Sequence, residues 1–86
     1  MVDHVYIIVQ NGDAYPEAYT TYASAVCAVK IKNREILEHE IHEAQSLESI
    51  EYILSDVNVP ENIEKGLTNL YIEKGINIII YKLPIS

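Results

Sequence analysis

Two segments of this chain are apolar on both faces of the strands that they would form. In Val5–Gln10 every residue before the glutamine is β-branched or aromatic, and in Ile76–Leu83 apolar residues occupy both alternating sets of positions. Successive side chains of a strand point to opposite faces of a sheet, so such strands normally lie at its centre with cover on both sides. A chain of 86 residues builds only one core, so the second cover is difficult to supply.

Turn-forming residues predict a hairpin at the start of the chain. Asn11-Gly12 directly follows the first strand, and this pair favours the left-handed backbone angles of a two-residue hairpin turn. The returning strand is expected at Ala14–Tyr19. Pro16 lies within it and cannot donate a ladder hydrogen bond, so this segment is a short edge strand or an irregular extended segment.

A second hairpin is predicted near the end of the chain. The segments Leu67–Ile72 and Ile76–Leu83 flank Glu73-Lys74-Gly75, whose glycine can take the left-handed position of a short loop. Before it, Asp56–Asn62 contains turn formers and a proline, which indicates an extended crossing loop.

Helical spacing occupies the middle of the chain. Thr20 or Thr21 can cap a helix, and apolar residues then recur at steps of three and four as far as Ile41, interrupted only by Asn33. This pattern predicts one long helix from about 22 to 44 with a bend near Asn33. Ser46 then predicts a new helix cap, with a second, short helix ending near Leu54.

These elements define an α+β fold of order β-β-α-(α)-β-β over a single domain, 1–86. The expected sheet is mostly antiparallel, with three to four strands, and the long helix lies on one face. The other face then lacks a cover. Assuming that the helix covers Val5, Ile7, Ile78 and Ile80, the uncovered face contains Tyr6, Ile8, Tyr71, Ile79 and Tyr81, and we expect it to bind a second copy in a homodimer or another protein.

Tyr15 belongs to a stretch, 15–22, that contains three tyrosines and a proline. Tyrosine and proline form rigid contact surface at low entropic cost, so Tyr15 is a further candidate for the interface. The alternative is that these tyrosines fill the edge of the core, because the chain has seven Tyr but no Phe or Trp.

The charge of the chain disfavours direct binding to nucleic acids. Thirteen acidic residues against six basic ones give a formal charge of −7, which repels phosphate backbones. The acids are densest at Glu35, Glu38, Glu40 and Glu43. They are interpreted as a solvated helix face that maintains solubility, and the alternative is an acidic decoy that imitates phosphate spacing and inhibits a nucleic-acid-binding protein.

A pair of histidines offers one candidate metal site, which the sequence disfavours. His39 and His42 lie three residues apart beside carboxylates, as zinc ligands on a helix could. Their spacing is one residue short of the zinc-protease His-Glu-x-x-His motif, and no third ligand is identifiable, so a hydrated helix surface is the preferred interpretation. A small metal-binding protein remains an alternative function.

The sequence offers no recognisable catalytic motif. It has no glycine-rich phosphate loop, nucleophile elbow or pair of catalytic acids, so we expect neither an enzyme nor a bound cofactor. Cys27, the single cysteine, lies in an apolar run and is expected to be a buried reduced thiol, which suits an intracellular protein. No export signal or membrane-spanning run is expected.

Two stretches, 11–22 and 70–78, resemble short proteins encoded by large DNA viruses of algae and amoebae, and the abundance of Ile, Asn and Tyr suits an AT-rich coding sequence. Such proteins have no assigned activity, so the resemblance implies a viral accessory or structural role and assigns no site residues. The expected function is a non-enzymatic, self-associating protein interaction module.

Overall fold

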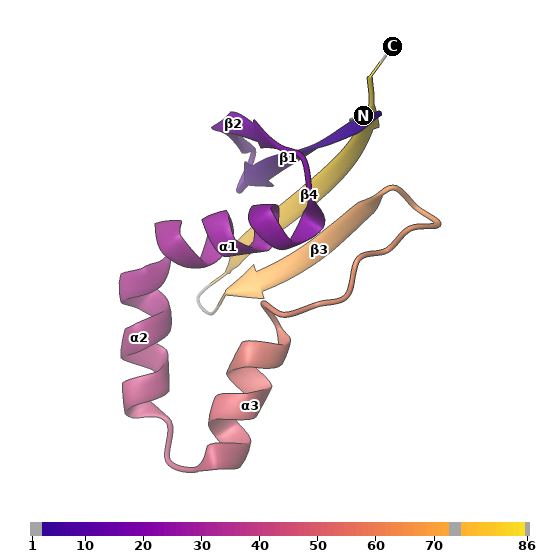
Figure 1. Cartoon of the computed structure of the whole chain (residues 1–86). Coiled ribbons are helices and arrows are strands. Elements are labelled where there is room, and N and C mark those ends of the chain that lie inside the picture. The colour runs from indigo at the N-terminus through magenta and orange to yellow at the C-terminus, as the bar shows by residue number, and fades with distance from the viewer. Residues whose placement is uncertain (1–2, 73–74, 86) are drawn as a thin grey trace.

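The computed structural model describes residues 3–72 and 75–85 of the chain. Its elements follow the order β-β-α-α-α-β-β, and all neighbouring strands are antiparallel, in the sheet order β2-β1-β4-β3 (Figure 1). The strands and helices are β1 (His4–Gln10), β2 (Asp13–Tyr19), α1 (Tyr22–Lys32), α2 (Arg34–Glu43), α3 (Leu47–Ser55), β3 (Leu67–Ile72) and β4 (Ile76–Pro84). The α+β class and the mostly antiparallel sheet are thus confirmed.

Strand composition, turn residues and helix caps in the sequence account for the positions of most of these elements. The two strands that are apolar on both faces, β1 and β4, are the central ones, as expected. Asn11 and Gly12 both have positive φ, at 49° and 90°, as their hairpin turn requires. Thr21 and Ser46 cap α1 and α3 by accepting backbone hydrogen bonds at 3.1 and 3.2 Å. Residues 73–74 of the second hairpin loop lie outside the described part of the chain.

The single long helix expected over 22–44 is wrong, because the helix breaks at Asn33. This residue has φ −106° and ψ 21°, and it separates α1 from α2. Its Nδ2 donates to the carbonyl oxygen of Val29, at 2.9 Å, and to Oε1 of Gln10, at 3.1 Å. Asn33 is therefore tied to the sheet as well as to the preceding turn, and α2 leaves in a new direction (Figure 1).

The core lies between the sheet and α1. Its fully buried side chains come from both central strands, the edge strand β3, the helix and the crossing loop: Ile8, Ile78, Ile80, Leu70, Val29 and Val57. Each such side chain stabilises the fold by about 1.5–3 kcal/mol relative to an exposed one. Among the helices that the structure describes, none is long and apolar enough to span a membrane.

The expected assignment of side chains to the two sheet faces is wrong for β1. Ile8 pairs with Ile80, and Tyr6 with Lys82, so the even-numbered residues of both strands share the helix side. Tyr6 and Ile8 are 4% and 0% exposed, in the core rather than on an uncovered face. A strand that is apolar on both faces does not reveal which face is buried, because a shift of one residue in register exchanges them.

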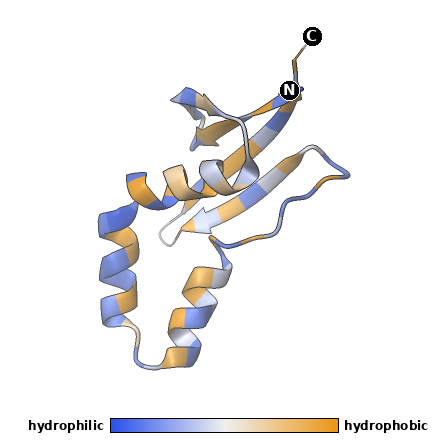
Figure 2. Cartoon of the chain, viewed as in Figure 1, coloured by the Kyte–Doolittle hydropathy of each residue, from blue (hydrophilic) through white to orange (hydrophobic). Residues whose placement is uncertain are grey.

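Helices α2 and α3 form a hairpin, here called the arm, that extends beyond the end of the sheet (Figures 1 and 2). The molecule is elongated, with extents of 48 × 23 × 20 Å. Its radius of gyration of 13.6 Å exceeds the roughly 12 Å of a compact chain of this length. Consistent with this shape, α3 has no buried residue.

Candidate protein interaction surface

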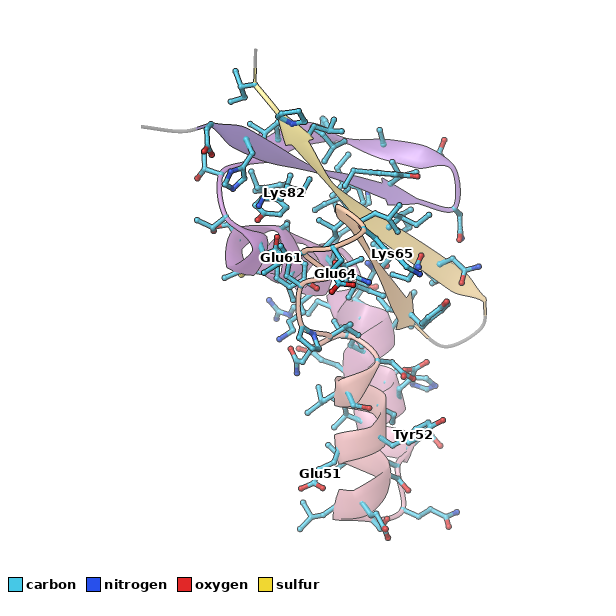
Figure 3. The ribbon with its side chains drawn as sticks, turned by 90° about the vertical axis from the view of Figure 1, so that its right-hand side faces the viewer. Glu51, Tyr52, Glu61, Glu64, Lys65 and Lys82 are labelled. Atoms are coloured by element: carbon cyan, nitrogen blue, oxygen red, sulfur yellow. The ribbon has the colours of Figure 1, made fainter. Side chains whose placement is uncertain are left out.

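The sheet face opposite α1 is apolar apart from two asparagines and is not covered by any helix in the described part of the chain (Figures 1 and 3). The pairing register joins its side chains into rows across the strands, such as Ile7, Tyr81 and Leu67, and next to it Val9, Ile79 and Asn69. We call this surface the open sheet face; on β1, β3 and β4 it consists of Val5, Ile7, Val9, Leu67, Asn69, Tyr71, Asn77, Ile79, Tyr81 and Leu83.

The open sheet face carries no charged residue, although charged residues make up 22% of the chain. Ile7, Ile79 and Tyr81 are half-buried at its centre, whereas Tyr71 and Leu83 at its margins are 52% and 44% exposed. Contiguous apolar patches larger than a few hundred Å² normally mark a place of association. This geometry suits contact with another apolar surface.

Only some of the interface residues expected from the sequence lie on the open sheet face. Tyr71, Ile79 and Tyr81 lie on the open sheet face. Tyr15, like Tyr6 and Ile8, is buried, at 8% exposed, and its hydroxyl donates to Oε1 of Gln10 at 2.6 Å. The sequence-based assignment put Val5, Ile7 and Val9 on the wrong face and did not include Leu67, whose side only the register reveals.

The other candidate residues lie away from this face. His39 and His42 are exposed on α2, and the described residues contain no group of three metal-ligating side chains. Glu35, Glu38 and Glu43 are exposed, but Glu40 is only 5% exposed, so the acidic run of α2 is not one solvated ridge.

The expected burial of Cys27 is wrong, because the structure places this thiol at the exposed surface of α1. Cys27 lies off the apolar stripe at steps of three and four, and the stripe is the side of α1 that packs on the sheet. Ala25, Val26 and Val29 are the buried ones.

Tyr6 makes the fold sensitive to alkaline pH. Burial, assisted by the 2.8 Å hydrogen bond that its hydroxyl donates to Oε2 of Glu61, raises the pKa of Tyr6 to about 12. An unfolded tyrosine ionises near pH 10, so the stability contributed by the neutral phenol is complete below that pH and is lost as the pH rises towards 12. Burial also raises the pKa values of Tyr15 and Tyr22.

We therefore expect urea unfolding to show a decline in stability between about pH 10 and pH 12, of which Tyr6 accounts for roughly 2 kcal/mol. Tyr6→Phe should make this decline shallower, whereas Tyr52→Phe, at a residue that is 73% exposed, should leave it unchanged. An identical decline in the Tyr6→Phe variant would contradict this assignment.

Comparison with known proteins adds no relative from which a function could be transferred. No family model matches the chain, and no curated protein or solved structure shows significant similarity to it.

Proposed function

We propose that this chain is a non-enzymatic protein interaction module that forms a homodimer through the open sheet face. The observation that carries the proposal is an uncharged, apolar sheet face without a cover among the described residues. Two such faces can pack about 10 Å apart as a sandwich. Each copy then supplies the second cover that the apolar strands of the other need.

The surface area of the chain supports the same proposal. The accessible surface is 6022 Å², whereas a compact monomer of 9.8 kDa exposes roughly 5,200 Å². The excess of roughly 800 Å² is close to the area that each partner contributes to a standard interface. Part of this excess comes from the arm, so the area supports association in general. The apolar character of the open sheet face indicates where the contact lies.

The charge distribution favours a second copy over a basic partner. Two chains that each carry a formal charge of −7 repel one another unless the acids lie away from the contact. The open sheet face has no acid among its strand residues, and many of the acids belong to α2 and α3, beyond the end of the sheet. An uncharged face offers a basic partner no electrostatic preference.

The mass in solution tests this function. Light scattering over a range of concentrations should give twice the chain mass, and Ile79→Lys should weaken the dimer at least about a hundredfold, because the ammonium would lose its water at the centre of the contact. Leu47→Lys, at a position on α3 that is 78% exposed, is the matched control and should leave the dimer intact. A wild-type chain that stays monomeric at millimolar concentration would refute the proposal.

The cellular setting is part of the same proposal. The exposed thiol of Cys27 would be open to oxidation outside cells, so we place the dimer in a reducing, intracellular compartment. The resemblance to short proteins of large DNA viruses suggests an accessory or structural role during infection.

A further inference from the structure

A groove separates the two helices of the arm and ends against the edge strand β3. It has a volume of about 870 Å³, within the range of small ligand-binding sites. Its lining includes the apolar side chains of Ala44 and Ile53, the imidazole of His39, and the carboxylates of Glu40, Glu43, Glu48 and Asp56. No lysine or arginine lines it among the described residues, so the groove combines apolar surface with several carboxylates.

One wall of this groove is a regular stripe along α3. Glu48 and Tyr52 of α3 and Asp56, the residue after its end, follow one another at intervals of four residues. Asp56 keeps helical backbone angles, so a carboxylate, an aromatic ring and a second carboxylate lie on one side. At 1.5 Å per residue, the stripe is about 12 Å long. Figure 3 shows Tyr52 and its neighbour Glu51 pointing to opposite sides of α3.

Two tyrosine rings from different elements border the groove. Tyr52 is 73% exposed and Tyr71, on β3, is 52% exposed, so neither ring serves the core. The backbone N–H of Tyr71 donates to the carbonyl oxygen of Asp56 at 3.0 Å, which fixes β3 against the end of α3. Tyrosine faces attract ammonium and guanidinium groups, and exposed tyrosines are frequent anchors of protein contacts.

From this arrangement we infer that the groove binds an extended peptide segment of another protein, with lysine or arginine at positions 1 and 5 and an apolar residue at position 3. Side chains at these positions of a strand point to the same side, and positions 1 and 5 lie about 13 Å apart, close to the length of the stripe. The two cations then meet Glu48 and Asp56, and the apolar residue meets Tyr52. Charge complementarity and the spacing of the stripe select this partner.

The inference does not depend on the proposed dimer, although the groove borders the open sheet face at Tyr71. The central rows of that face, through Ile7, Tyr81 and Ile79, do not line the groove. The Ile79→Lys variant should therefore bind the peptide as the wild type does, and the two proposals can fail separately.

The test uses the whole protein and a labelled peptide, Lys-Ser-Leu-Ser-Lys, blocked at both ends, with binding followed by fluorescence anisotropy. Tyr52→Ala should weaken binding about tenfold and Glu48→Gln about fivefold, since each removes one contact at an exposed position that the core does not need. Glu35→Gln removes the same charge from an exposed position on α2 that does not line the groove, so it should leave the affinity within twofold.

Three outcomes would overturn the inference. The first is no binding of the peptide at millimolar concentration. The second is an equal loss in Glu48→Gln and Glu35→Gln, which would mean that the net charge of the chain attracts the peptide. The third is displacement of the peptide by equimolar spermidine, or equal binding of Lys-Ser-Ser-Ser-Lys, because either result would show that cations alone are recognised.

Discussion

Replacing Ile8 by alanine should lower the free energy of unfolding by about 3 kcal/mol, whereas the same change at Ile7, the preceding residue of β1, should cost less than about 1 kcal/mol in the monomer. Ile8 is 0% exposed and pairs with Ile80, which is 1% exposed, so alanine leaves a cavity that the sheet and α1 cannot close. Ile7 points to the open sheet face and is half-buried. The two substitutions remove the same atoms from opposite faces.

Urea unfolding at protein concentrations too low for dimerisation measures this difference without the contribution of a dimer. A loss of 3 kcal/mol is a large part of the 5–15 kcal/mol that stabilises a typical domain, so the Ile8→Ala midpoint should move clearly. A larger loss in Ile7→Ala than in Ile8→Ala would mean that β1 is shifted by one residue against β4.

The second large effect is expected at Asn33. This side chain is 4% exposed, and Asn33→Ala removes its hydrogen bonds to Val29 and Gln10 and leaves the Gln10 amide without its partner at the helix break. We expect a loss of about 1–3 kcal/mol, because buried polar groups that lose their partners keep the full cost of leaving water. Asn58→Ala, in an exposed loop, should change stability by less than about 0.5 kcal/mol.

A double-mutant cycle measures the interaction energy between Asn33 and Gln10. If Asn33 and Gln10 act together, the double alanine variant should lose less stability than the two single variants combined, by about 0.5–3 kcal/mol. Additive losses would show that Asn33 stabilises only its own helix end.

Local chemistry made most of the element order predictable. Asn11-Gly12 predicted its hairpin and Thr21 was one of two expected caps of the first helix, because these features depend on the backbone angles and hydrogen bonds of a few adjacent residues. The position of the helix break was also indicated, since Asn33 interrupts the apolar pattern. The complete separation of α1 from α2 was not indicated, because the hydrogen bond between Asn33 and Gln10 joins residues 23 positions apart.

The candidate sites could be predicted only in part. An uncovered apolar sheet face followed from the composition of β1 and β4, but its members in β1 did not, since both faces of that strand are equally apolar. The stripe of Glu48, Tyr52 and Asp56 can be found in the sequence by its spacing. The groove cannot, because its opposite wall and Tyr71 come from elements that only the tertiary fold brings together.

The strand order β2-β1-β4-β3 also determines when the sheet can form. Its central ladder joins β1 to β4, so Gln10 pairs with Ile78 and His4 with Pro84 across almost the whole chain. Closing so long a loop costs entropy before any contact offsets it, and folds dominated by distant pairings form slowly. During synthesis on the ribosome, the first hairpin therefore keeps its apolar surface exposed until β4 has emerged. Transiently exposed apolar surface and unpaired strand edges are prone to aggregate, so this interval is when the chain is most exposed to that risk.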